Sequence, residues 1–459
     1  MSKKLHLAGF TMASHVTHSH SAWRHPESRI DFTRASYYHE IAKTLERGKF
    51  DFVFFADMLA FPERFGNSIE ASIQKGVQFT ASLDPLHVAT SIAAVTKYLG
   101  VAVTKSVTHF SPFDIARAFG TIDHLSNGRI GWNIVTSLNE AESKNFGHLD
   151  ILDRSLRYDR AEEFVDLALK LWNSWEADAI LADKESGTFA DPNKINITGH
   201  KTSNFNVQGP LSVPRSPQRR PVFFQAGASD RGRDFAAKWG EAIFEIDPTS
   251  EGRKAFYQDL KRRAISHGRN PDQIKIFPAF IPFIGETKEA ALAQQKFHNE
   301  KADPISGLIT LSAHTDHDFS QYHLDEGISN IEVPGSQGLF NLAKRLSDKD
   351  NLTIRDIGQL YAQGVLLPQL IGTAEQIADQ IEEIFHSEEA DGFLISPSYT
   401  PGTFIDFVDH VVPILQQRGL HKTEYEGETL RENLGLKDAP YRPTAKNNSD
   451  FQQHKQDVA

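Results

Sequence analysis

The sequence contains no cysteine among its 459 residues. This absence excludes disulfide bonds, thiolate metal sites and cysteine nucleophiles. No apolar run is long enough to cross a membrane, and the opening MSKKLHLAGF lacks the apolar centre of a signal peptide. Acidic residues outnumber basic ones by 60 to 49, and the net charge of −11 leaves no basic footprint for nucleic acid or an anionic membrane. We therefore expect a soluble cytoplasmic protein.

Short runs of β-forming residues alternate with helical patterns along most of the chain. This alternation fits a (β/α)8 TIM barrel better than an open sheet. A hydrophobic content of 39% is enough for a core of that size. The eight predicted strands are Leu5–Phe10, Phe52–Ala56, Gly100–Thr104, Arg129–Ser137, Pro221–Gln225, Ala242–Phe244, Ile274–Phe283 and Gly392–Ile395.

A single α/β barrel domain is expected over residues 1–439, with two interruptions. Residues 173–219 are polar, rich in proline, glycine and asparagine, and too long for an ordinary connection. Residues 303–369 show no clean periodicity. We interpret both segments as long insertions, and the polar residues 440–459 as a C-terminal tail.

Capping residues indicate where two of the outer helices begin. Ser111 precedes Pro112 and a run of apolar residues at helical spacing, which predicts a helix to about Ser126. Thr373 and Gln376 have the spacing of a capping box, and a helical apolar stripe follows them.

Polar side chains gather where predicted strands end, at the face of a TIM barrel that carries chemistry. Asp57, Thr104 and Ser137 lie at such ends, and Asn133 lies inside a strand. A buried amide needs several hydrogen-bond partners, so a ligand is expected near Asn133. Taken singly, Asp57 fits a helix cap better than a general base, and Thr104 fits a satisfied hydroxyl as well as a ligand.

The loop Ala226–Arg233, AGASDRGR, has the composition of an anion site. Its small residues let the amides of Ala228 and Ser229 approach a phosphate, and Ser229 opens a helix whose dipole is positive at that end. A glycine-containing loop with an ordinary serine cap is an equally good interpretation. Arg154 and Tyr158, four residues apart on one helix face, either offer a cation and a hydroxyl to the same phosphate or form a solvated surface pair.

Four histidines crowd the loop after the first strand: His15, His18, His20 and His25. His18 and His20 have the His-x-His spacing of metal-dependent amidohydrolase barrels. Those barrels also need imidazole and carboxylate ligands at later strand ends, and these are nearly absent here. We therefore expect no metal site, and favour a loop that faces the substrate.

An aromatic-rich pocket for an organic substrate is expected from Phe10, Trp23 and Phe55. His20 and Asn133 are the candidates for a catalytic group, and the catalytic residue itself stays unassigned.

Several long motifs occur in the same order as in one known family. They are FVFFADML, SPFDIARAFGTIDHLSNGRIGWNIVTS with NFG after it, LWNSWE, PVFFQAGASDRGRDFAAK and GLHKTEYEGETLRENLGL. The chain thereby resembles the family of nitrilotriacetate monooxygenase, dibenzothiophene sulfone monooxygenase and pristinamycin IIA synthase. This family is a branch of the bacterial luciferase-like, flavin-dependent oxygenases, and the resemblance covers almost the whole chain.

The resemblance implies a two-component monooxygenase that uses reduced FMN and dioxygen. A separate NAD(P)H:FMN reductase would supply the reduced flavin, in agreement with the absence of a GxGxxG fingerprint. The substrate would be a small organic molecule that is oxygenated next to nitrogen or sulfur, with cleavage of a C–N or C–S bond. A homodimer or homotetramer is expected.

The resemblance also implies which residues contact the flavin. The family's flavin-contacting positions match Asp57, Thr104, Tyr158 and Ser229, with Asn133 and Ser137 as neighbours under the ring. Many members have a histidine where this chain has Arg154. Arginine still offers donors to a phosphate, but the acid–base role of that histidine is left open.

Two other functions stay open on the sequence alone. A metal-dependent hydrolase on a TIM barrel would lose activity to chelators. A non-catalytic flavin-binding protein would bind FMN without dioxygen-dependent turnover.

Overall fold

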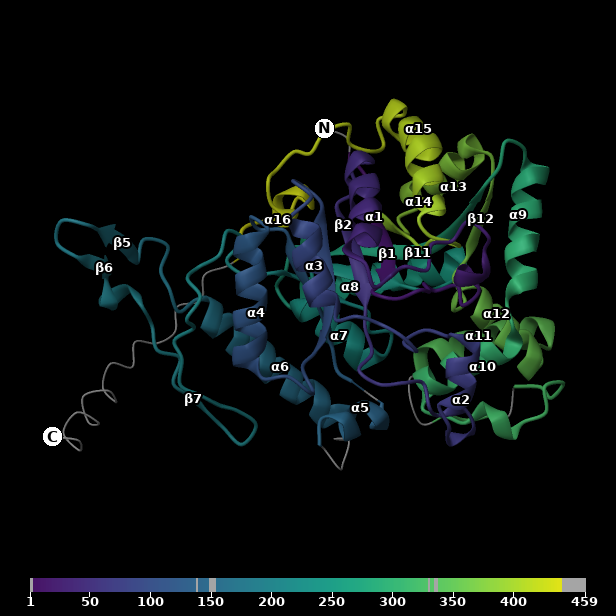
Figure 1. Ribbon diagram of the computed structural model, residues 1–459, viewed down its shortest axis with the longest axis horizontal. Coiled ribbons are helices and arrows are strands. Elements are labelled where there is room, and N and C mark those ends of the chain that lie inside the picture. Colours follow the sequence, from purple (N-terminus) through teal and green to yellow (C-terminus); the bar gives the residue numbers. More distant parts are fainter. Residues whose placement is uncertain (1–2, 138, 148–153, 329–330, 334–336, 440–459) are drawn as a thin grey trace.

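The structure, a computed structural model, describes residues 3–137, 139–147, 154–328, 331–333 and 337–439 (Figure 1). Eight parallel strands form a closed ring, because the last strand pairs with the first. In ring order they are β1 (His6–Met12), β2 (Phe52–Ala56), β3 (Gly100–Ser106), β4 (Ile130–Val135), β9 (Val222–Gln225), β10 (Ala242–Glu245), β11 (Lys275–Ile284) and β13 (Gly392–Ile395). The predicted (β/α)8 barrel is confirmed.

Helices surround this barrel, and the capping residues begin them as predicted. The Ser111 hydroxyl accepts from the Asp114 amide at 3.1 Å, and Thr373 forms a capping box with Gln376. Across the described ranges, no helix combines the length and the apolar character needed to cross a membrane. The helices around the barrel and its loops are α1 (Ala35–Arg47), α2 (Glu70–Lys75), α3 (Pro85–Ala93), α4 (Pro112–Leu125), α5 (Glu140–Asn145), α6 (Arg154–Trp172), α7 (Asp230–Trp239), α8 (Ser250–Ser266), α9 (Lys288–Lys301), α13 (Ala374–His386), α14 (Gly402–Asp406) and α15 (Val412–Gln417).

Aromatic rings fill the interior of the barrel. The Phe52 ring centroid lies 4.8 Å from that of Phe224, and the Phe54 centroid lies 4.1 Å from that of Phe244. Gly131 of β4 lies directly against the Phe224 ring, and a Cβ atom there would overlap it. The interior is therefore a packed core with no room for a ligand.

One strand that adjoins the barrel was not predicted. β12 (Gln369–Gly372) pairs in parallel with the last four residues of β11, from Ile281 to Ile284. β11 is ten residues long and pairs with β13 only at Ala279 and Phe280, so its outer part is free to pair with another strand. The sequence QLIG is too short to show a strand period.

Residues 173–219, interpreted as an insertion, carry two small antiparallel hairpins. The first pairs β5 (Ile180–Asp183) with β6 (Thr188–Ala190), and the second pairs β7 (His200–Lys201) with β8 (Asn206–Val207). Figure 1 shows the first hairpin projecting away from the barrel.

The second segment interpreted as an insertion, 303–369, folds mainly as α10 (Pro304–Thr315), α11 (Gln337–Asp350) and α12 (Ile354–Gly364). α10 and α12 pack closely because Gly307 approaches the backbone of Gly358, where a Cβ atom could not fit. Most of α10 is buried. It therefore has no polar face, which explains why the sequence shows no helical period there.

The chain after α15 covers the end of the barrel opposite to the strand tips. Leu430, in α16 (Leu430–Asn433), and Leu434 pack with the phenylalanines of the interior. Lys422 pairs with the buried Asp51, which directly precedes β2. Ligand access to the barrel interior is therefore confined to the face where the strands end.

Candidate functional site

Thr104 and Asn133 face each other across β3 and β4, where they are register partners. The Thr104 hydroxyl donates to the Phe55 carbonyl at 2.9 Å, so it can only accept from Asn133. The Asn133 amide nitrogen donates to Thr104 at 2.9 Å, and its Oδ1 atom is then left buried without a partner in the described part of the chain. A buried acceptor of this kind needs a donor that the described part of the chain does not supply, and a bound ligand could provide it.

Asp57 follows β2 and completes the same cluster of polar groups. A small cavity brings Asp57, Thr104 and Ser137 together with Lys105 and Glu142. Burial raises the pKa of Asp57 to about 7; Asp84 and Glu142 also raise it, whereas Lys105 opposes the shift. The strand tips thus hold a carboxyl that can be neutral or charged near neutral pH.

Glu142 also lines this cavity and was not predicted from the sequence. It lies in the short helix α5 after β4 and accepts from the Leu59 amide at 2.9 Å. Burial raises its pKa above the ordinary value. No motif marks it, because it reaches the cavity only through the fold of the loop between β4 and α6.

Ser229 begins α7 and caps it, since its hydroxyl accepts from the Gly232 amide at 3.1 Å. A Cβ atom on Gly232 would lie 2.8 Å from the Tyr158 hydroxyl and 3.0 Å from the Ser229 hydroxyl. Two hydroxyls from α6 and α7 therefore flank one glycine at a helix N-terminus. Such a donor set fits a phosphate. The space for the phosphate exists because Gly232 has no side chain.

Two further residues were predicted to contact the phosphate, and the structure describes the side chain of only one of them. Ala228 is exposed in the loop before α7, and Gly338 of α11 lies against it. Segment 303–369 therefore reaches over this loop. Arg154 is the first residue of α6, but its side chain lies outside the described residues.

Histidines form a second cluster, beside β1. The His18 ring stacks on Phe10 at 3.6 Å and its Nδ1 contacts the Ser396 hydroxyl at 2.9 Å. His314 of α10 contacts the Tyr361 hydroxyl at 2.7 Å through Nδ1. Burial lowers the pKa of His18 to about 3 and that of His314 to about 4, with mutual repulsion adding to the effect on His18. These imidazoles are therefore neutral near pH 7.

His20 is the member of this cluster without a protein partner. Both of its ring nitrogens are buried, and neither bonds to any residue that the structure describes. Burial and the nearby His314 lower its pKa to about 3. His20 and Trp23 also line a cavity of about 280 Å³. His314 was missed by the sequence analysis because α10 lies almost 300 residues further along the chain.

The three aromatic residues predicted for a substrate pocket have different positions. Phe10 is close to the strand tips through its contact with His18, and Trp23 lines a cavity with His20. Phe55 does not face the barrel interior. It belongs to the core between the barrel wall and the helices and packs on Tyr38, so this part of the prediction is wrong. The neighbouring Phe54 is the one that points inward.

A metal site was the alternative interpretation of the histidines in the loop after β1. In the ranges that the structure describes, no group of three or more histidine, aspartate or glutamate side chains is arranged to hold a metal ion. Among these residues, His18, His20 and His314 are neutral and have no carboxylate among their contacts.

Comparisons with known proteins identify the family of this chain. A family model described as luciferase-like monooxygenase matches residues 11–392. Dibenzothiophene-sulfone monooxygenase of Rhodococcus erythropolis (strain XP) is 46% identical, over 95% of this chain and 97% of that protein. Nitrilotriacetate monooxygenase component A of Aminobacter aminovorans is 39% identical, over 91% of this chain and 93% of that protein.

A solved structure extends the comparison to three dimensions. The crystal structure of riboflavin lyase (RcaE) with modified FMN and the substrate riboflavin matches with a TM-score of 0.87 and 33% identity, and covers 95% of this chain and 97% of that one. The resemblance inferred from the motifs is confirmed by these matches.

Proposed function

This chain belongs to the luciferase-like monooxygenase family and is a flavin-dependent monooxygenase, and on that premise we propose that it is the oxygenase component of a two-component system. A separate NAD(P)H:FMN reductase supplies reduced FMN, and dioxygen is the co-substrate. The name of the relative called component A supports this division of labour, and the modified FMN in the riboflavin lyase structure supports a flavin mononucleotide as the cofactor. Bound reduced FMN supplies the electrons that activate dioxygen, and the chain binds, orients and shields it.

The FMN phosphate is assigned to the N-terminus of α7. The Tyr158 and Ser229 hydroxyls and the amides that follow Ala228 offer neutral donors there. The helix dipole favours the negative charge, and Gly232 leaves the space. Arg154 is proposed as an additional donor from the start of α6.

The polar edge of the flavin ring is assigned to the cluster at the ends of β2, β3 and β4. The observation that carries this proposal is the unpartnered Oδ1 of Asn133, whose amide orientation is fixed by Thr104. The isoalloxazine edge has an N–H donor between two carbonyl acceptors, which suits Asn133 together with the nearby Asp57 and Ser137. A carboxyl with a pKa of about 7 can hold or release a proton beside that edge.

The substrate is proposed to be a small organic molecule that is oxygenated next to sulfur or nitrogen, with cleavage of the C–S or C–N bond. The two named relatives act on a sulfone and on an aminopolycarboxylate by their names. His20 and Phe10 are proposed to contact the substrate, because His20 keeps two free ring nitrogens and Phe10 lies beside the histidine cluster.

A coupled assay tests this function. The protein is mixed with NADH, FMN, an FMN reductase and ¹⁸O₂, together with thioethers, sulfones or aminopolycarboxylates in turn. We expect ¹⁸O in the product, and C–S or C–N cleavage, only when both reductase and FMN are present. Photoreduced FMN in place of the reductase should also support the reaction, because the flavin can diffuse. Activity that survives without flavin and is lost to EDTA would contradict the proposal.

A further inference from the structure

A cavity of about 610 Å³ lies at the end of the barrel opposite to the strand tips. Residues that precede β9, β10 and β11 line it, together with the C-terminal ends of α6 and α7 and the turn after α8. This volume is in the range of small-molecule sites. The lining includes Leu169, Arg220, Trp239, Glu241 and Arg269, with Lys437 and Asp438 at its exposed edge.

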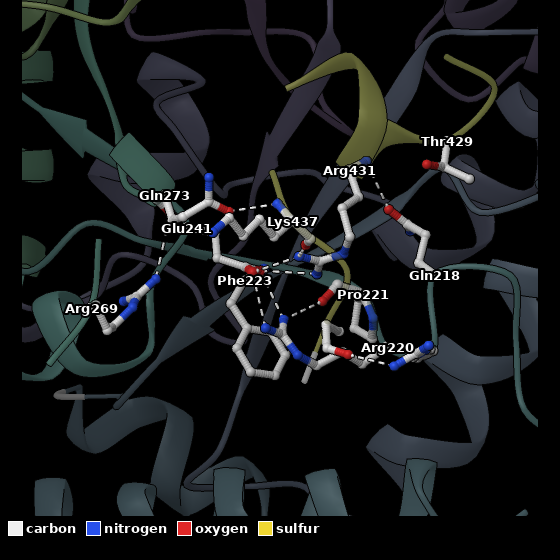
Figure 2. Close-up of polar contacts among 12 residues, drawn as sticks. Gln218, Arg220, Pro221, Phe223, Glu241, Arg269, Gln273, Thr429, Arg431 and Lys437 are labelled. Carbon is white, nitrogen blue, oxygen red and sulfur yellow. Dashed lines mark hydrogen bonds and ion pairs between the residues drawn. The ribbon is translucent and has the colours of Figure 1, made fainter. Parts of the chain in front are cut away.

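Glu241 is shared by two guanidinium groups. Its carboxylate accepts from Arg220 at 2.8 and 2.9 Å and from Arg431 at 2.7 Å. Figure 2 shows the two arginines approaching this carboxylate from different sides. Both guanidinium groups thus share the one carboxylate of Glu241, which lines the cavity.

Arg269 adds a third guanidinium and stands apart from Glu241 in Figure 2. It donates to the Ala237 carbonyl at 2.8 Å and to the Gln273 carbonyl at 3.5 Å. Within the described ranges it pairs with no carboxylate. Burial lowers its pKa to about 10. An anion in the cavity would provide the charged partner that the chain does not.

Two other basic residues of the rim are already paired. Lys238 pairs with Glu162, and His267 contacts Asp234 at 2.8 Å. Lys437 also lines the cavity, but its side chain is exposed, so Arg269 is the half-buried lining cation that is available to a ligand. Its planar fork can hold a carboxylate or a phosphate through two hydrogen bonds.

Part of the remaining wall of the cavity is apolar. Trp239, the last residue of α7, and Leu169 of α6 line it, and both are largely buried. This part of the wall favours a ligand with an apolar body in addition to its charge, and a flat ring would pack well on the indole.

We propose that this cavity binds a small organic anion, with a flat apolar body against Trp239 and one carboxylate or phosphate group on Arg269. The site is separate from the proposed flavin site, because Ser229 begins α7 at the strand tips and Trp239 ends it at the opposite face. The proposal does not depend on the proposed function.

Calorimetric titration of the full-length protein with three probes tests this assignment. The probes are 2-naphthoate, 2-naphthyl phosphate and the neutral 2-naphthamide. We expect at least one anion to bind at least about tenfold more tightly than the amide, and the tighter of the two identifies the preferred head group. Equal affinity for all three probes would overturn the proposal, and this comparison needs no variant.

Variants then locate the binding. Arg269→Gln should weaken the better anion at least about tenfold, and Arg269→Lys should lie in between because it keeps the charge and loses the fork. Arg262→Gln, on the exposed side of α8, is the matched control and should bind like the wild type. Ser229→Asp should also leave this affinity unchanged. Wild-type affinity in Arg269→Gln, or loss in Ser229→Asp, would place the anion elsewhere.

Discussion

The Asn133 amide donates to the Thr104 hydroxyl over 2.9 Å, and this bond decides which way the amide points. The Thr104 hydroxyl donates its proton to the Phe55 carbonyl, so it can only accept from Asn133. The Asn133 oxygen is then left without a donor among the described residues. Replacement of Asn133 should therefore affect turnover more than it affects the stability of the fold.

Replacing Asn133 by alanine tests that relationship. We expect kcat to fall at least about tenfold while the Kd for FMN changes by less than about threefold, because the amide orients the ring and the phosphate provides most of the affinity. The free energy of unfolding should fall by about 1 kcal/mol, since Thr104 loses its donor. Coupled turnover and flavin titration measure both effects. Asn193→Ala, at an exposed position, is the control, and equal losses of kcat in the two variants would rule out the assignment.

Ser229→Asp should abolish FMN binding. A carboxylate at this cap would face the phosphate, and the repulsion should raise the Kd at least about a hundredfold. Aspartate is itself a good N-cap, so the melting temperature should stay near the wild-type value. Thr287→Asp, at the exposed cap of α9, makes the same change away from the site. Unchanged affinity in Ser229→Asp, measured by fluorescence titration, would move the phosphate to another place.

Asp57 should make the protein less stable as pH rises. The pKa of Asp57 is raised from 3.8 to about 7 in the folded chain, so its stabilising effect is complete below pH 3.8 and is lost as pH rises through 7. Asp57→Asn should therefore unfold with nearly the same free energy as the wild type at pH 4 and be more stable by about 1–2 kcal/mol at pH 8, after allowance for partial exposure. Urea unfolding at both pH values measures the difference. A variant that is less stable at pH 8 would contradict the shift.

The buried imidazole of His20 should act in the opposite sense. Its pKa is lowered from 6.5 to about 3, because the fold favours the neutral imidazole. The free energy of unfolding is therefore highest above pH 6.5 and decreases as pH falls toward 3. In the wild type, His20 should lower the free energy of unfolding by about 1.4 kcal/mol for each pH unit below 6.5, and His20→Asn should abolish this contribution. Denaturation at pH 5 and pH 7 tests the slope. The same variant should lower kcat without changing the Kd for FMN, and a parallel loss of flavin affinity would argue against a substrate contact.

Gly131→Ala should disturb the packed interior of the barrel. The new methyl group would overlap the Phe224 ring, which cannot move because Phe52 packs on it. We expect a loss of about 1–3 kcal/mol in the free energy of unfolding. Gly327→Ala, where nothing lies within 4 Å of the new atom, should be close to neutral. Equal stability of the two variants in urea unfolding would mean that the core is not close-packed at β4.

Local patterns predicted much of the fold and part of the candidate site. Ser111 and Thr373 begin helices where their spacing indicated, and the eight strands lie where β-forming residues cluster. Asp57, Thr104 and Ser137 come together because parallel strands of a barrel end at the same face. These features follow from contacts between residues that are close in the sequence or from the geometry that all such barrels share.

The side of a strand on which a residue lies could not be predicted for FVFFA. All five residues are apolar, because this strand is buried both against the barrel interior and against the helices. No alternation distinguishes Phe54 from Phe55, so the choice of Phe55 for the substrate pocket had no local basis.

By itself, the sequence determined the barrel, its strand order along the chain, the helix starts and the polar strand tips, because short-range hydrogen bonds and periodic burial encode them locally. Only the tertiary structure decided that His314 of α10 would lie near His18 and His20, that Glu142 would enter the cavity beside Asp57, and that Arg269 would line one cavity with Arg220 and Glu241. These groups meet through packing between segments that are far apart in the chain, and such contacts leave no spacing that a local pattern could reveal.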